Sequence, residues 1–175
     1  MLTSLLAIAV LHWAVLIIPG FNFVLIGQLA AGGSRAAAMS AVAGMTMATL
    51  VWATLAIAGV GIVFTAHPAL RQLAQIAGGL YLLYLEFKLW RSGSVSANAA
   101  PVLGSAAAFR AGFMTSVLNP KIALFYGSVF ATSLPQNPSL LIVSLAVLLV
   151  FANSVIWHSS LALLLSRPKV QTAYL

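Results

Sequence analysis

Long apolar segments separated by short polar turns make up most of this chain. A helix needs about 20 apolar residues to cross a hydrocarbon core of about 30 Å, and five segments reach that length. The five predicted spans cover residues 5–28, 36–64, 68–90, 109–133 and 139–165. Each should be helical, because backbone polar groups cannot stay unpaired in lipid. The pattern therefore predicts an all-α integral membrane protein, a helical bundle of five transmembrane spans.

The composition supports this class and argues against several others. Of 175 residues, 62% are hydrophobic and 5% are charged, whereas soluble domains carry about 25% charged residues. The eight Lys and Arg residues give a net charge of +7 but are dispersed along the chain, so they form no basic stripe for nucleic acid. The chain has three histidines, no cysteine and one carboxylate, Glu86. We therefore predict no nucleic-acid partner, no metal site, no cofactor and no enzymatic activity.

A polar linker at residues 91–108 divides the single transmembrane domain, residues 1–175. It separates a first three-helix repeat, residues 1–90, from a second and incomplete one, residues 109–175. Lys and Arg near the ends of spans are retained on the cytoplasmic side. The side that holds the linker has six such residues, and the other side has Arg71 alone. We therefore expect the linker in the cytoplasm and the N-terminus outside.

Proline interrupts two of the predicted spans, and the first interruption is at Pro19-Gly20. Pro19 has no N–H to donate to the carbonyl of Val15, and Gly20 further loosens the helix. Polar backbone is therefore expected inside the membrane at this point. Asn22 lies three residues after Pro19 and places an amide side chain near the break.

The second interruption, in the span at residues 109–133, is Asn119-Pro120-Lys121. Pro120 is expected to free the carbonyl of Ser116. Lys121 puts a cation near the middle of a span, which costs about 2.5–3.5 kcal/mol and requires a partner or water. Its side chain is too short to reach the membrane surface from that depth, so we predict a functional role.

Broken helices at corresponding places in two halves are the best sequence indicator of a transporter site. The breaks fall in the first span of each half, and three spans per half make the halves run in opposite directions. This arrangement is an inverted repeat of three-helix units. Free carbonyls suit an ammonium group, and a lysine with a helix N-terminus suits a carboxylate. A zwitterionic amino acid carries both groups.

Four short motifs follow one another along the chain, and together they resemble a known family. They are Pro19-Gly20-Phe21-Asn22, Gly78-Gly79-Leu80-Tyr81-Leu82-Leu83-Tyr84-Leu85, Phe109-Arg110-Ala111-Gly112-Phe113 and Leu118-Asn119-Pro120-Lys121. Their order and spacing resemble the LysE/RhtB family of amino-acid exporters over nearly the whole chain. The resemblance implies proton-driven export of amino acids or their derivatives across the bacterial inner membrane, by a small protein capable of forming a homodimer. The substrate-binding residues that it implies are Pro19, Gly20, Asn22, Asn119, Pro120 and Lys121.

Three features depart from the family pattern. Phe21 replaces a second proline, and Glu86 stands where relatives have a small residue. The family has six spans, and the chain stops at Leu175, about where a sixth would begin. We therefore expect a truncated member that lacks the last span. The alternative to an exporter is an inactive or non-transporting membrane subunit.

Three further residues are candidates for proton coupling. His12 and His158 lie inside predicted spans and titrate near neutral pH when unperturbed. Glu86 is the single carboxylate but lies near the end of its span. For the histidines the competing interpretation is a packed, hydrogen-bonded side chain, and for Glu86 it is an interfacial position.

Overall fold

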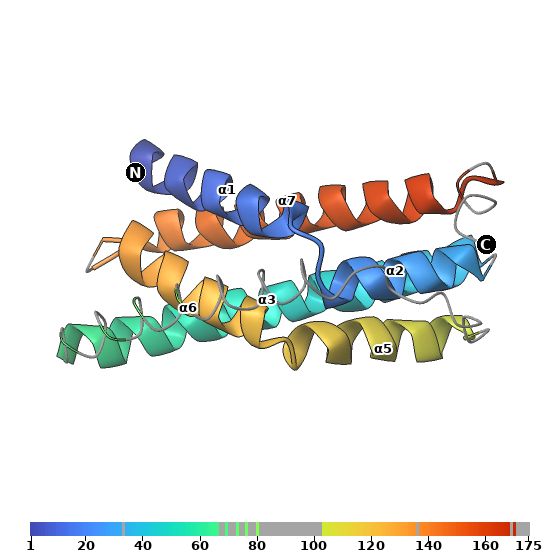
Figure 1. The fold of residues 1–175 in the computed structure, drawn as a ribbon. Helices are drawn as coiled ribbons and strands as arrows, with labels where there is room; N and C mark the ends of the chain where they lie inside the picture. Colours follow the sequence, from blue (N-terminus) through green and yellow to red (C-terminus); the bar gives the residue numbers. More distant parts are fainter. Residues whose placement is uncertain are drawn as a thin grey trace.

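The computed structural model describes two stretches of the chain, and both are helical (Figure 1). The described residues are 1–66 except 33, 103–170 except 136 and 169, and the single positions 69, 73, 76 and 80. Most of the predicted third span, most of the linker and Glu86 lie outside them. Within them the structure has six helices and no strand. The helices are α1 (Leu2–Ile17), α2 (Phe21–Ala31), α3 (Arg35–Ala66), α5 (Ser105–Val117), α6 (Pro120–Ser133) and α7 (Leu140–Leu165).

Two described helices are long and apolar enough to cross a membrane unaided, and a third candidate is a bent pair. The first two are α3, over Arg35–Gly59, and α7, over Leu140–Leu165. Helices α1 and α2 qualify together, with a bend of 54° between them. The α5–α6 pair is not among these candidates, and most of the predicted span at residues 68–90 lies outside the described residues. The membrane class and the helical fold are therefore confirmed, while the count of five spans stays a prediction.

Side-chain caps set the starts of three helices. The Ser34 hydroxyl accepts a hydrogen bond from the Ala37 N–H at 3.1 Å at the start of α3. Asn119 caps α6, and Ser139 caps α7. Helix α2 differs, because its N-cap residue is Gly20 and no side chain caps it.

The two broken helices run in opposite directions along the bundle (Figure 1). Helices α1 and α2 follow one another along the bundle, and α5 and α6 follow one another the other way. Helix α1 contacts α6, and α2 contacts α5. Both breaks therefore lie near the middle of the bundle, where they meet. This antiparallel arrangement is the one expected of an inverted repeat, which stays a prediction for the chain as a whole.

Two glycines allow α3 and α5 to pack closely. A Cβ added at Gly44 would overlap the carbonyl of Phe109 and lie 2.7 Å from the Phe113 nitrogen. A Cβ added at Gly112 would overlap the Ala41 carbonyl. Small residues allow helix backbones to approach closely in membrane proteins. The break before α6 is thereby anchored on the straight helix α3.

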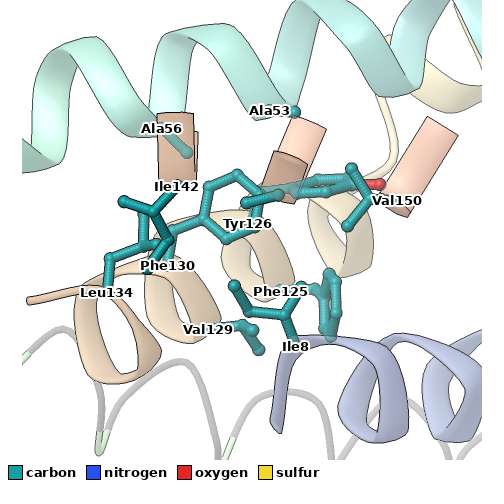
Figure 2. Close-up of a cluster of buried hydrophobic side chains, with 11 residues drawn as sticks. Ile8, Ala53, Ala56, Phe125, Tyr126, Val129, Phe130, Leu134, Ile142 and Val150 are labelled. Carbon is teal, nitrogen blue, oxygen red and sulfur yellow. The ribbon is translucent and has the colours of Figure 1, made fainter. Parts of the chain in front are cut away.

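Two apolar clusters occupy opposite halves of the bundle. One joins α1, α6, the second half of α3 and the first half of α7; Figure 2 shows Tyr126 inside it, between Ala53 and Ala56 on one side and Ile8 and Phe125 on the other. The second cluster joins α2, α5, the first half of α3 and the second half of α7. Between the clusters, near the middle of α3 and α7, the buried residues include the polar side chains Thr49, Ser154 and His158. The broken helices therefore meet in a polar layer.

Candidate functional site

The first break leaves the start of α2 open. Helix α1 ends at Ile17, Pro19 is exposed, and Gly20 has an extended backbone. The first helical hydrogen bond of α2 runs from the Val24 N–H to the Gly20 carbonyl at 3.1 Å. The N–H groups before Val24 therefore have no partner within the helix. With the dipole of α2, they form a partially positive end that favours negative charge.

The second break is closed by its own residues. The Asn119 side chain accepts a hydrogen bond from the Lys121 N–H at 3.0 Å, which caps α6. Pro120 is the first residue of α6, a position where the missing proline N–H leaves no helical bond unmade. The Ser116 carbonyl accepts a hydrogen bond from the Asn119 N–H at 3.3 Å. The carbonyl that the sequence predicts to be free is thus bonded within the break.

Lys121 links the second break to the first. Its side chain is 6% exposed, and its Nζ donates to the Ile18 carbonyl at 3.3 Å. The partner that the sequence analysis requires for this buried cation is therefore present, and it is the carbonyl of Ile18. A Cβ at Gly20 would lie 3.8 Å from Nζ, so the ammonium also lies beside the open end of α2.

Asn22 makes a second connection between the breaks. Its Oδ1 accepts a hydrogen bond from the Ser116 hydroxyl at 3.1 Å, and its Nδ2 donates to His158 Nε2 at 3.4 Å. Ser116 lies in the last turn of α5 and is buried. The side chain of Asn22 thereby joins α2 to both α5 and α7.

A cavity of about 50 Å³ lies where these groups meet. A water molecule needs about 10–15 Å³ of such space, so the cavity has room for a few waters. Of the six predicted binding residues, four line it: Gly20, Asn22, Asn119 and Lys121. Exposed Pro19 is not one of its lining residues; Pro19 and Pro120 contribute through the backbone that they interrupt.

Both predicted histidines line the same cavity. His12 Nε2 lies 3.1 Å from the Tyr126 hydroxyl, and its ring stacks on Phe125 at 5.3 Å. His12 Nδ1 is buried and has no hydrogen-bond partner among the described residues. His158 is held by Ser154, through its carbonyl at 2.9 Å and its hydroxyl at 3.1 Å. The third candidate, Glu86, lies outside the described residues.

Several polar and aromatic residues of the site are not predicted by the sequence analysis. Thr49 of α3 and Tyr126 of α6 line the cavity, and Ser116 contacts Asn22. Ser116 lies four residues before Pro120, and the sequence analysis used this spacing to place its carbonyl at the break. The same spacing could also have placed its hydroxyl there. The aromatic lining residues are Phe21, Phe23, Phe125, Tyr126 and Trp157. The described lining thus combines one amine, two imidazoles, amides, hydroxyls and aromatic rings, and it contains no carboxylate.

Broken helices that meet at a polar cavity inside an apolar bundle are the arrangement of secondary transporters. The chain belongs to the LysE type translocator family, whose model matches residues 13–174. The fold, the cavity and the family agree on a membrane transporter.

Several curated relatives are similar to this chain. The threonine efflux protein of Escherichia coli K12 is 30% identical, over 99% of this chain and 87% of the relative. The leucine efflux protein of Klebsiella pneumoniae is 31% identical, over 70% of this chain and 59% of the relative. An uncharacterized membrane protein of Haemophilus influenzae is 23% identical, over 97% of this chain and 84% of the relative. No solved structure matches the chain.

Proposed function

We propose that this protein exports small neutral amino acids across the bacterial inner membrane and binds them in the cavity between the two helix breaks. The family, and relatives described as threonine and leucine efflux proteins, support amino-acid export. The proposal includes a proton gradient as the driving force, an outside N-terminus and a cytoplasmic linker. The excess of basic residues on the linker side supports this orientation.

Lys121 and the open end of α2 form the carboxylate-binding half of the proposed site. The lysine supplies a full positive charge at low exposure. The first N–H groups of α2 supply donors that no side chain caps. A carboxylate between them would accept charge-assisted hydrogen bonds, which are about twice as strong as neutral ones.

The Ile18 carbonyl and the aromatic rings form the ammonium-binding half. In the structure Lys121 Nζ donates to this carbonyl at 3.3 Å, so the position accepts an ammonium group. On substrate binding, the substrate ammonium would replace Lys121 Nζ at this carbonyl. Lys121 Nζ would then turn to the substrate carboxylate. Phe21 and Trp157 also line the cavity, and aromatic faces attract cations.

The charge and size of the cavity favour small neutral side chains. Its described lining has Lys121 as a cation and no carboxylate to balance a second one. A lysine or arginine substrate would therefore bring an unpaired charge into a buried space, which costs several kcal/mol. A volume of about 50 Å³ also restricts the side chain, unless the walls move.

The single observation that supports this assignment most strongly is the hydrogen bond from Lys121 Nζ to the Ile18 carbonyl. It places a buried ammonium from one break on the exposed backbone of the other, at the cavity. Neither break alone would provide partners for both the ammonium and the carboxylate group of an amino acid.

The test compares efflux of labelled threonine and leucine from vesicles that contain wild-type protein or Lys121→Met. Loss of a hydrogen bond to a charged group costs about 1.5–3 kcal/mol, so we expect about a ten- to hundredfold loss of kcat/KM. Arg110→Met is the matched control, because Arg110 is an exposed cation that does not line the cavity. It should transport like the wild type.

Gly20→Asp changes the same site at the first break. Its carboxylate would cap α2 and pair with Lys121, so we expect a folded protein that no longer transports. Unchanged efflux in both Lys121→Met and Gly20→Asp would refute the proposed site. Absence of amino-acid efflux by the wild type would refute the proposed function.

A further inference from the structure

A chain of hydrogen bonds crosses the polar layer and joins both helix breaks to α7 and α3. It begins at the Met45 carbonyl and passes in order through Thr49, Ser154, His158, Asn22 and Ser116. His158 is the one titratable side chain of α7, and it is 5% exposed. The proposed function makes no use of this chain beyond Asn22.

The bonding partners fix which ring nitrogen of neutral His158 carries the proton. The Ser154 carbonyl can only accept, so His158 Nδ1 donates to it at 2.9 Å. On the other side of Ser154, the Thr49 hydroxyl donates to the Met45 carbonyl and therefore accepts from the Ser154 hydroxyl at 3.1 Å. The Nδ1 proton is thus held by fixed acceptors, and Nε2 accepts from Asn22.

An added proton can therefore enter His158 at Nε2 alone. Nε2 would change from acceptor to donor and would face the N–H₂ group of Asn22, which is also a donor. A half-turn of the Asn22 amide restores the contact by presenting Oδ1 to the imidazolium. The amide nitrogen would then face Ser116, whose hydroxyl can rotate to accept. Protonation reverses the bond direction along the Ser116–Asn22–His158 segment.

We infer that His158 is the proton-coupling residue of this exporter and that Asn22 transmits its protonation state to both helix breaks. This inference rests on the proposed function. Asn22 lies in the first turn of α2, and Ser116 lies in the last turn of α5. The reversal therefore changes the donors and acceptors at both breaks at once.

The other titratable groups of the cavity have different connections. They are His12 on α1 and Lys121 and Tyr126 on α6; α2 and the cavity-lining part of α3 supply the neutral polar residues Asn22 and Thr49. His12 Nε2 contacts the Tyr126 hydroxyl, which can both donate and accept. Protonation of His12 is accommodated by rotation of that hydroxyl, and His12 makes no direct hydrogen bond to either break among the described residues.

The charges also set the sign of the coupling. Lys121 is already a cation in the cavity, and the described lining contains no carboxylate. An imidazolium at His158 would add a second positive charge where the substrate ammonium must bind. Proton binding and amino-acid binding therefore oppose each other, which is the requirement for exchange of an outgoing amino acid for an incoming proton.

The experiment measures threonine exchange in liposomes that contain purified protein, with no pH gradient, over a range of pH. In the wild type we expect KM to rise as the pH falls, approaching tenfold per pH unit once His158 is protonated. His158→Gln keeps polar contacts without titrating, so it should exchange threonine with a KM that does not change with pH. It should also lose accumulation driven by a pH gradient. His12→Gln is the matched control: it removes the other imidazole of the cavity and leaves the Ser116–Asn22–His158 segment intact, so its KM should still rise as the pH falls.

A second measurement needs no variant and covers the case in which His158→Gln fails to fold. Threonine is added to wild-type protein in weakly buffered detergent solution at acidic pH, and a pH dye reports proton release. We expect up to one proton released per threonine bound. A pH-independent wild-type KM, a wild-type slope in His158→Gln, or binding without proton release would overturn the inference while leaving export intact. Wild-type protein that neither binds nor exchanges amino acids would overturn the proposed function as well.

Discussion

The two helix breaks contain a similar set of residues but differ in how their polar groups are satisfied. At the first break the proline precedes a glycine N-cap, and the start of α2 has no side-chain cap. At the second break the proline is itself the first residue of α6, and Asn119 caps that helix. The first break therefore offers backbone donors and acceptors to other groups. The second satisfies its own backbone and contributes a cation.

This difference shows that a broken membrane helix can serve two purposes. An open break can bind a ligand, since its N–H and C=O groups have no partner within the helix. A capped break can hold a side chain at a fixed place, as α6 holds Lys121 against the Ile18 carbonyl. The proposed binding site uses one break of each kind.

The largest expected effect comes from replacing the proline of the first break, Pro19. In Pro19→Ala the new N–H can bond to the Val15 carbonyl, so α1 can continue through the break. Proline inside a helix costs about 3 kcal/mol, and its removal favours the continuous helix by a similar amount. The Ile18 carbonyl would then leave Lys121, and we expect threonine efflux to fall by about ten- to hundredfold.

Pro120→Ala is the control for that change. Proline at the first helical position gives up no helical bond, so alanine there should leave efflux within about twofold of the wild type. For both variants, efflux from vesicles measures transport, and circular dichroism measures helix content. Equal losses in the two variants would show that the breaks are equivalent, contrary to the difference described above.

A smaller effect is expected from removing the cap of the second break. Loss of an N-cap side chain costs about 0.5–2 kcal/mol, so Asn119→Ala should lower the thermal midpoint of the purified protein in detergent. Ser139→Ala removes the cap of α7, whose hydrogen bond is longer at 3.5 Å and lies outside the cavity. It should have the weaker effect on the midpoint. If Asn119→Ala abolished efflux at an unchanged thermal midpoint, Asn119 would have to contact the substrate directly.

The breaks themselves could be predicted because proline has a local effect. Pro19 and Pro120 remove a backbone donor whatever surrounds them, so the ends of α1 and α5 follow from the sequence. The depth of Lys121 follows from counting residues along an apolar span. Its need for a partner follows from the cost of burying a charge.

The partners could not be predicted in the same way, because they depend on how the helices are rotated. Lys121 Nζ donates to the carbonyl of Ile18, and this pairing depends on the bend between α1 and α2. Ser116 and Asn22 are 94 residues apart in sequence, and nothing in their local pattern pairs them. The histidines lie in apolar helices whose local sequence does not show which way a side chain faces, so the sequence could not show that both face one cavity.

The buried positions of α3 illustrate the same limit. Thr49 lies in a helix that is apolar on most faces, and a threonine there is compatible with simple packing. Its contact with Ser154 at 3.1 Å gives it a place in the polar layer. Gly44 is a small residue and so suggests a close helix contact. That the contact is with Phe109 depends on the position of α5, which the sequence does not give.

The central claim is that the two breaks meet inside one protein, and cysteine cross-linking tests it most directly. The chain has no native cysteine, so Asn22→Cys/Ser116→Cys creates a single pair where two side chains now share a hydrogen bond of 3.1 Å. Oxidation, or a short thiol cross-linker, should join the two positions within one chain in native membranes, as read by mass spectrometry of the linked peptides. Threonine should slow the reaction. A folded double variant that forms no such link, under conditions where each thiol reacts singly, would contradict the account.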